Sequence, residues 1–295
     1  MPELPEVETI RRELSGKIIK QKIKEVETLA IKSVHNPSVF FTRQLAGNQF
    51  TKIDRRGKLL IFSLKIGNQK LLVHLKMTGQ LVYRRGKQLI FGGHEISPND
   101  LVVPNRFTRI VFHFSDKSAL YFNDMRRFGF MKLVPDAEVE KLVGKSYGID
   151  ALSPEFTKEY LISALKKRSQ ATIKAALLNQ KHLAGIGNIY ADEVCFATGI
   201  LPSRRVGSLS SAKTSEIHTA IKRVLKLAIK HGGTTFSSQV LTGHYLRSDG
   251  GKGNFTQYLK VFDRTGEKCL RCKKGIIKKT RVAGRGTHFC PQCQH

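Results

Sequence analysis

The apolar positions of the chain follow two periodicities, a strand-like one in the first half and a helical one in the second. Val7, Ile10 and Leu14 share one helical face, so the N-terminal residues predict a short helix, which Gly16 can end. Between residues 17 and 133, short β-rich runs separated by turn residues predict a β-sandwich or barrel. The clearest runs are KLLIFSL (58–64), KLLVHL (70–75), TRIVFHF (108–114) and SALYF (118–122).

Helical patterns dominate after residue 152, where Ser153 and Pro154 give a helix-start signal. Helices are expected up to about residue 166 and over 170–179, 187–199 and 209–231. The last of them ends at Gly232-Gly233 and has the clearest buried stripe, formed by Ile217, Ile221, Val224, Leu225 and Ala228. The turn-rich stretch 84–107 is interpreted as an insertion between strands, and the Gly-rich stretch 233–258 as a flexible loop.

The size and charge of the chain narrow its possible functions. Its 295 residues are enough for two domains at about 150 residues each. The composition, with 40% hydrophobic and 25% charged residues, is typical of a globular protein. The 51 Lys and Arg against 23 Asp and Glu leave a formal charge of +28, which favours nucleic acid as partner, and an anionic membrane surface second. No apolar run reaches the length of a membrane span and the N-terminus has no signal-peptide pattern, so we expect a soluble, intracellular protein.

Four of the five cysteines form a metal-binding pattern near the C-terminus, Cys269-x2-Cys272-x17-Cys290-x2-Cys293. Two CxxC turns at this spacing present four thiolates to one tetrahedral zinc ion, and because all four positions are filled the metal is interpreted as structural. Cys195 stands alone in a helical pattern, and this distribution argues against a disulfide framework. We therefore expect one structural Zn²⁺ that stabilises a hairpin too small to have its own core.

Several polar side chains occupy positions from which they can bind phosphate. Arg285 lies between two glycines inside the cysteine hairpin, at a tip that can approach a phosphate closely; a solvated basic tip is the alternative. Asn188 follows a Gly-Ile-Gly turn at the start of a predicted helix, where free N–H groups can bind an anion, although an ordinary turn between helices fits as well. Lys58 and His74 stand at predicted strand ends and can meet at one edge of the sheet, or simply be solvated there.

The N-terminus combines an amine with carboxylic acids. After removal of Met1, Pro2 would carry a secondary amine beside Glu3 and Glu6. An amine that attacks C1′ of a sugar forms an iminium ion, which expels the base and then favours elimination of phosphate, while nearby carboxyl groups transfer protons. A Pro- and Glu-rich helix start is the alternative. With Met1 in place the Pro2 nitrogen is an amide, so the active form requires removal of Met1.

Six motifs are distributed over nearly the whole chain: MPELPEVETIRR, RRGKLLIF, HLKMTGQL, NDMRRFGF, LAGIGNIYADE and the four-cysteine hairpin. With them the chain resembles the formamidopyrimidine-DNA glycosylases, bacterial enzymes that excise oxidised purines. The resemblance implies an α+β fold with DNA bound in the cleft between its two halves. Its domains would be an N-terminal catalytic β-sandwich with a leading helix (2–135), a helix-two-turns-helix domain with a base-recognition loop (150–258) and a zinc-finger β-hairpin (259–295).

The resemblance also implies roles for individual residues. Pro2 would be the Schiff-base nucleophile, Glu3 the general acid and base, and Glu6 its supporting carboxylate. The phosphate-binding positions that flank the lesion in this family correspond to Lys58 and Arg285, which are also placed in the catalytic set, and to His74 and Asn188.

Base excision requires the nucleotide to leave the stack, and the resulting gap must be filled. Met77, Arg126 and Phe128 match the residues that the family inserts: an apolar wedge, a guanidinium for the opposite cytosine and an aromatic wedge. Without the resemblance, Met77 and Phe128 would be interpreted as core residues. The related endonuclease VIII group, which prefers oxidised pyrimidines, usually has Gly where this chain has Leu4, so residues 4–7 favour the purine-specific branch.

We expect a bifunctional DNA glycosylase and AP lyase of base excision repair that removes 8-oxoguanine and formamidopyrimidines and cleaves the strand by β- and δ-elimination. Its partner would be double-stranded DNA with damaged bases or abasic sites, and it would act as a monomer in the bacterial cytoplasm, at the nucleoid. Departures from the family pattern at 105–109 and in a lengthened loop at 236–248 leave open a preference shifted to oxidised pyrimidines or abasic sites. A non-catalytic damaged-DNA-binding protein and a zinc-ribbon RNA or ribosome binder are the alternatives.

Overall fold

The computed structural model describes residues 1–93, 102–234 and 255–295. The chain forms two compact units: unit 1 contains Met1–Val143 and Ile229–Thr256, and unit 2 contains Gly144–Ala228 and Gln257–His295. The expected insertion at 84–107 lies partly, and the lengthened loop at 236–248 entirely, outside the described residues.

Unit 1 begins with helix α1, Leu4–Ile18. The three apolar positions that predict this helix are all buried. The prediction that Gly16 ends it is wrong, because the apolar face continues beyond that residue. Leu14 and Ile18 lie four positions apart on the same face and are both buried, so the helix gains from including its last turn.

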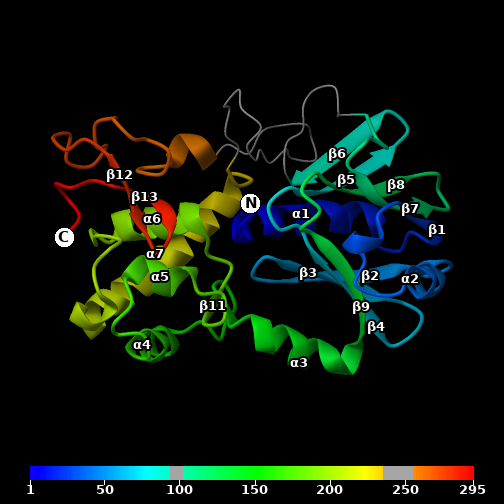
Figure 1. Cartoon of the computed structure of the whole chain (residues 1–295), viewed down its shortest axis with the longest axis horizontal. Helices are drawn as coiled ribbons and strands as arrows, with labels where there is room; N and C mark the ends of the chain where they lie inside the picture. Colours follow the sequence, from blue (N-terminus) through cyan, green and yellow to red (C-terminus); the bar gives the residue numbers. More distant parts are fainter. Residues whose placement is uncertain (94–101, 235–254) are drawn as a thin grey trace. The chain divides into compact units, whose positions relative to one another are not determined.

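Two antiparallel sheets form most of unit 1 (Figure 1). The first has the strand order β1 (Ile23–Thr28), β7 (Thr108–Phe114), β8 (Ala119–Asp124), β5 (Gly79–Arg85) and β6 (Gln88–Gly93). The second has the order β2 (Phe50–Arg56), β3 (Leu59–Leu64), β4 (Gln69–His74) and β9 (Phe130–Pro135). All four predicted β-rich runs form strands, and TRIVFHF coincides with β7.

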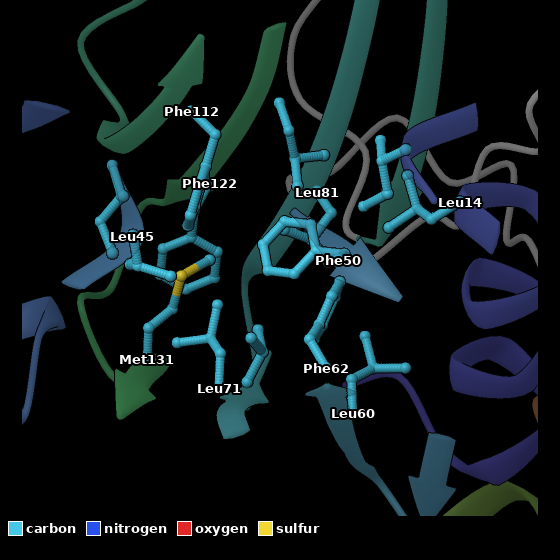
Figure 2. Packing of buried hydrophobic residues seen from close by; sticks show 14 of the residues in the cluster. Leu14, Leu45, Phe50, Leu60, Phe62, Leu71, Leu81, Phe112, Phe122 and Met131 are labelled. Atoms are coloured by element: carbon cyan, nitrogen blue, oxygen red, sulfur yellow. The ribbon is translucent and has the colours of Figure 1, made fainter. Parts of the chain in front are cut away.

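One hydrophobic core joins the two sheets, as Figure 2 shows. The ring of Phe50 on β2 lies 5.1 Å from the ring of Phe62 on β3 and 5.9 Å from that of Phe112 on β7, so side chains of both sheets interdigitate. Leu14 of α1 and Leu45 of helix α2 (Ser38–Leu45) also belong to this core. Each buried side chain of this size stabilises the fold by about 1.5–3 kcal/mol. The predicted β-sandwich is confirmed.

The sequence pattern does not predict α2, helix α3 (Asp136–Ser146), the short 3₁₀ turn Ile31–Ser33 or strand β6. In α2, Val39 and Phe40 are exposed whereas Phe41 and Leu45 are buried, so its run of apolar residues does not mark one face. Strand β6 lies inside the expected insertion and pairs with β5 in an antiparallel hairpin.

Unit 2 is mainly helical in its described residues. Its helices are α4 (Lys158–Lys166), α5 (Ile173–Leu178), α6 (Asn188–Ala197) and most of α7 (Ser211–Lys230), with a 3₁₀ turn at Val206–Ser208; a further 3₁₀ turn, Phe255–Tyr258, begins in unit 1 and ends in unit 2. Strand β10 (Ile149–Asp150) pairs in parallel with β11 (Leu183–Ala184), and β12 (Lys278–Val282) pairs antiparallel with β13 (Arg285–Phe289). No helix in the described part of the chain is long and apolar enough to cross a membrane.

Helix α4 begins later than the signal at Ser153 and Pro154 predicts. The hydroxyl oxygen of Thr157 accepts a hydrogen bond from the Tyr160 amide at 3.1 Å and caps the helix, whereas Ser153 takes part in a turn with Phe156. Helix α7 agrees with its prediction: the expected stripe is buried except for Val224, which is partly exposed, and two glycines follow the helix.

Candidate active site

The N-terminal carboxylates are buried and held by hydrogen bonds. Glu3 and Glu6 are each 3% exposed, and Pro2 is buried beside them. Oε2 of Glu6 accepts a hydrogen bond from the Glu3 amide at 2.9 Å, while Oε1 accepts from the amide and the hydroxyl of Thr234 at 2.9 and 3.1 Å. Glu6 therefore fixes the backbone of Glu3 at the start of α1 and connects it to the residue that follows the glycines after α7.

Gly233 allows this arrangement. Its φ is +80°, and a Cβ at this position would lie 2.7 Å from Oε1 of Glu6. Only a residue without a side chain combines this backbone conformation with so close an approach.

Helix α1 is attached to β2 through Glu8. Its carboxylate accepts hydrogen bonds from Arg11 and Arg12 and forms an ion pair with Arg55 at 3.1 Å. Burial raises the pKa of Glu8, but the hydrogen bonds from Arg11 and Arg12 and the charge of Arg55 outweigh it and lower the pKa to about 2. The helix that carries Glu3 and Glu6 is thus anchored one turn further along.

The chain start lies among charged groups of unit 1. Burial lowers the pKa of the amino group at Met1, Glu3 and Glu6 act in the opposite direction, and Lys58 and Arg126 lower it further. The net effect is a lowered pKa. These residues, distant in sequence, therefore share one electrostatic environment at the N-terminus.

Lys58 and His74 come together at one sheet edge, as their places at strand ends predict. Lys58 lies in the turn before β3, and the first residue of β3, Leu59, is paired with His74 at the end of β4. The two side chains are 4% and 5% exposed. Nδ1 of His74 accepts a hydrogen bond from the Lys76 amide at 2.9 Å, and burial, with the charges of Lys76 and Lys58, lowers the pKa of His74 to about 3. The imidazole is neutral near pH 7, with its proton on Nε2.

Met77, Arg126 and Phe128 lie on two neighbouring loops of unit 1. Met77 is 42% exposed and Phe128 is 58% exposed, so neither belongs to the core. Nη1 of Arg126 lies 3.5 Å from Sδ of Met77. The structure thus brings the three residues together at the surface, where two of them expose apolar side chains.

Asn188 and Arg285 lie in unit 2. Asn188 is the first residue of α6, and its Nδ2 donates a hydrogen bond to the carbonyl of Gly286 at 3.0 Å. Gly286 follows Arg285, which is exposed at the start of β13. The helix start and the hairpin tip are therefore in contact, and the two residues named by the sequence patterns belong to one local structure.

The sequence patterns do not single out Lys174, which is fully buried on α5. Its ammonium group donates to Gly286 O at 3.0 Å and to Thr287 Oγ1 at 2.8 Å, and pairs with Asp192 Oδ1 of α6 at 2.6 Å. Oδ2 of Asp192 accepts from the His288 amide at 2.8 Å. This network fixes β13 against the helices; its only sequence signal is a lysine inside the apolar run IKAALL.

The next residue of α6 holds the other end of the hairpin. The carboxylate of Glu193 accepts hydrogen bonds of 2.9–3.0 Å from the amides of Lys260, Val261 and Phe262, just before the cysteine pattern begins. Figure 1 shows β13 running beside α6.

The four cysteines of the predicted zinc site converge. Their Sγ atoms all lie within 4.8 Å of one another, with 3.6 Å between Cys269 and Cys293 and 3.7 Å between Cys272 and Cys290. A tetrahedral zinc ion with bonds of about 2.3 Å requires sulfur atoms about 3.8 Å apart, so the cluster fits one structural Zn²⁺. Cys195 is buried on α6, and burial raises the pKa of its thiol. None of the five forms a disulfide, as the spacing predicts.

Comparison with known proteins identifies the family. Residues 1–131 match the formamidopyrimidine-DNA glycosylase N-terminal domain, residues 147–240 the H2TH domain of the same enzymes, and residues 266–295 a zinc finger found in FPG and IleRS. The chain belongs to the formamidopyrimidine-DNA glycosylase family. This membership confirms the expected enzyme class, a bifunctional DNA glycosylase and AP lyase that acts on oxidised purines in base excision repair, and the expected fold with its zinc finger.

Full-length relatives and solved structures agree. The chain is 41% identical to a formamidopyrimidine-DNA glycosylase of Symbiobacterium thermophilum, over 100% of this chain and 89% of the relative, and 40% identical to that of Carboxydothermus hydrogenoformans over the whole of both. A Lactococcus lactis Fpg in complex with abasic-site DNA aligns with a TM-score of 0.84 at 33% identity over 99% of each chain. A MutM bound to DNA containing carbocyclic 8-oxo-G aligns over the whole of both chains with a TM-score of 0.85 at 33% identity.

Proposed function

We propose that this chain binds double-stranded DNA with an oxidised purine or an abasic site and uses the Pro2 amine, freed by removal of Met1, as its nucleophile. The observation that carries this proposal is the chain start itself: Pro2 is buried next to Glu3, and Glu6 is locked in place by the Glu3 amide and Thr234. Glu3 and Glu6 cap α1 through reciprocal hydrogen bonds with its backbone, and the same arrangement holds both carboxyl groups beside the amine, where they can transfer protons.

The reaction begins when the lone pair of Pro2 attacks C1′ of the damaged nucleotide. The N–C1′ bond forms as the bond to the base breaks, and the departing base takes up a proton. The nitrogen then gives up its proton and Glu3 protonates the ring oxygen O4′ as the C1′–O4′ bond breaks, which leaves an iminium ion between Pro2 and C1′; Glu6 keeps Glu3 in position. The iminium ion then acts as electron sink: loss of a C2′ proton breaks the C3′–O bond, a second elimination breaks the C5′–O bond, and water releases the sugar remnant from Pro2.

Phosphate contacts come from both units in this proposal. In unit 1, Lys58 supplies a buried positive charge, and His74 a neutral Nε2–H donor whose tautomer the Lys76 amide determines. In unit 2, the Asn188 side chain and the exposed Arg285 guanidinium bind phosphates of the DNA backbone next to the lesion. A formal charge of +28 supports a polyanionic partner.

The surface group Met77, Arg126 and Phe128 fills the gap left by the extruded nucleotide. The exposed side chains of Met77 and Phe128 enter the base stack, and the guanidinium of Arg126 binds the partner base. The three parts 2–135, 150–258 and 259–295 then supply catalysis, backbone contacts and the zinc hairpin. The enzyme acts as a monomer at the bacterial nucleoid.

Borohydride trapping tests the proposal. Protein with Met1 removed, verified by mass spectrometry, is incubated with duplexes that contain 8-oxoguanine, dihydrouracil or an abasic site, and Pro2→Gly and Met1-retaining protein serve as controls. We expect a covalent adduct with 8-oxoguanine and abasic DNA that requires Pro2 and a free N-terminus. Preferential adduct formation with dihydrouracil would indicate a pyrimidine-specific enzyme, and tight binding without an adduct on any duplex would indicate a damage-binding protein that has no lyase activity.

A further inference from the structure

A single buried carboxylate connects the two loops that carry Met77, Arg126 and Phe128. Asp124, the last residue of β8, is fully buried. Its Oδ1 accepts hydrogen bonds from the hydroxyl of Thr78 and from the Arg126 amide, the latter at 3.2 Å, and its Oδ2 accepts from the Gly129 amide at 2.7 Å. The carboxylate therefore spans its own loop from Arg126 to Gly129 and reaches across to the neighbouring loop through Thr78.

Thr78 completes the connection from the other side. Its hydroxyl oxygen accepts a hydrogen bond from the Arg126 amide at 3.0 Å while the hydroxyl proton goes to Asp124. Thr78 directly follows Met77 and is 7% exposed. The Thr78 hydroxyl thus connects the loop that carries Met77 with the backbone of Arg126.

The backbone around Asp124 is fixed as well. The Asp124 amide donates to the carbonyl of Phe107, and the Asp124 carbonyl accepts from Nε of the buried Arg109, both at 2.9 Å. At the far end of the loop, a Cβ on Gly129 would lie 2.8 Å from the ring of Phe122. The loop from Asp124 to Gly129 is therefore seated tightly at both ends, and only the side chains of Arg126 to Phe128 extend into solvent.

We propose that Asp124 and Thr78 are positioning residues that hold Met77, Arg126 and Phe128 as one preorganised unit, so that the three side chains enter the DNA together. This inference rests on the proposed function, because it assumes that these side chains fill the gap. Misplacement of a positioned group by about 1 Å can reduce a rate about 100-fold, so a loop connection of this kind is expected to affect base excision strongly. Neither residue touches the reacting atoms, and their effect passes through Arg126 and Met77.

Substitution of Thr78 gives the most specific test of this positioning role. Thr78→Val keeps the shape of the side chain but removes the donor to Asp124 and the acceptor for the Arg126 amide, whereas Thr78→Ser keeps both. Ser118→Ala is a matched control: Ser118 is 1% exposed, and its hydroxyl also donates to a carboxylate, that of Asp116 at 2.5 Å, but just before the start of β8, far along the strand from Asp124.

The readouts are single-turnover excision of 8-oxoguanine opposite cytosine and opposite adenine, and strand cleavage of a single-stranded abasic oligonucleotide, which needs no gap filling. We expect Thr78→Val to lower excision opposite cytosine by about 10- to 100-fold and to reduce the preference for cytosine over adenine, with cleavage of the single strand unchanged. Thr78→Ser and Ser118→Ala should retain both the rate and the preference.

Two outcomes would overturn the proposal. If Thr78→Val lowers all three rates by the same factor, the hydroxyl supports the fold in general and does not position the wedge. If Thr78→Val matches the unmodified enzyme in every readout, the connection has no role. Asp124→Asn, with its folding checked by thermal unfolding, gives a second independent variant with the same expectation.

Arg126→Ala and Phe128→Ala separate this inference from the proposed function. If neither changes excision or the opposite-base preference, the gap-filling assignment itself is wrong. If both do so while Thr78→Val does not, the assignment stands and only the positioning role of Thr78 and Asp124 fails.

Discussion

The contact between Gly233 and Glu6 gives a prediction with a matched control. Gly233 has a φ of +80°, and a Cβ there would lie 2.7 Å from Oε1 of Glu6. Gly67 has nearly the same φ, +77°, but a Cβ there would have no atom within 4 Å. Gly233→Ala and Gly67→Ala therefore share the strain of a left-handed backbone and differ in the collision with Glu6.

The magnitudes follow from these contacts. Alanine in a left-handed conformation costs about 1–2 kcal/mol, which is the loss of unfolding free energy expected for Gly67→Ala. In Gly233→Ala the Glu6 carboxylate must also move away from Thr234, whose amide and hydroxyl donate to it at 2.9 and 3.1 Å. A hydrogen bond to a carboxylate contributes about 1.5–3 kcal/mol, and because both end on one oxygen we expect a total loss of about 3–5 kcal/mol.

Urea unfolding measures the loss of stability, and the rate of borohydride trapping on abasic DNA measures the effect on the site. Since Glu6 fixes the backbone of Glu3, we expect trapping by Gly233→Ala to be slower than by Gly67→Ala by about tenfold or more, which corresponds to about 1.4 kcal/mol in the barrier. Equal losses of stability and equal trapping rates in the two variants would show that the Glu6 contact contributes nothing.

Three further predictions concern the chain start, the buried lysine and the hairpin tip. Burial lowers the pKa of the Met1 amino group, so in protein that retains Met1 this group should titrate at a lower pH than the amine of a free peptide MPELP; a titration at or above that of the peptide contradicts this. Lys174→Met leaves Asp192 buried without its cation and should lower the free energy of unfolding, measured in urea, by about 3–5 kcal/mol. Lys226→Met, at an exposed position, should lower it little, and similar losses in the two variants would contradict a stabilising role of the buried pair. Arg285→Ala should reduce the slope of log affinity for abasic DNA against log salt concentration by about 0.9, and an unchanged slope would show that Arg285 contacts no phosphate.

The features that the sequence predicts best are those specified over short stretches. The alternation in TRIVFHF gives β7 at its exact bounds, and the two CxxC turns bring four sulfur atoms together. The ends of helices are harder to predict, because several residues near each end can cap or terminate the helix. Gly16 could end α1, but the burial of Ile18 outweighs it, and Thr157 rather than Ser153 caps α4.

Partners that are distant along the chain leave no local signal. Thr234 holds Glu6 across 228 positions, and Lys174 reaches Thr287 across 113. Thr78 and Asp124 stand inside the motifs that carry the family resemblance, yet nothing in those motifs indicates that a hydroxyl of one binds the carboxylate of the other. The sequence therefore predicts which residues form the candidate site, and the structure adds the contacts that hold them in place.

Helix α6 carries three attachments of the zinc hairpin. Asn188 at its first turn contacts Gly286, Asp192 binds the His288 amide, and Glu193 binds the amides that precede the cysteines. Because one helix holds the hairpin at both ends, a rotation of α6 about its axis would move Asn188 and Arg285 together. The helix and the hairpin are therefore expected to move as one body, so a change in the reach of Arg285 would come from its own side chain or from the tip between β12 and β13.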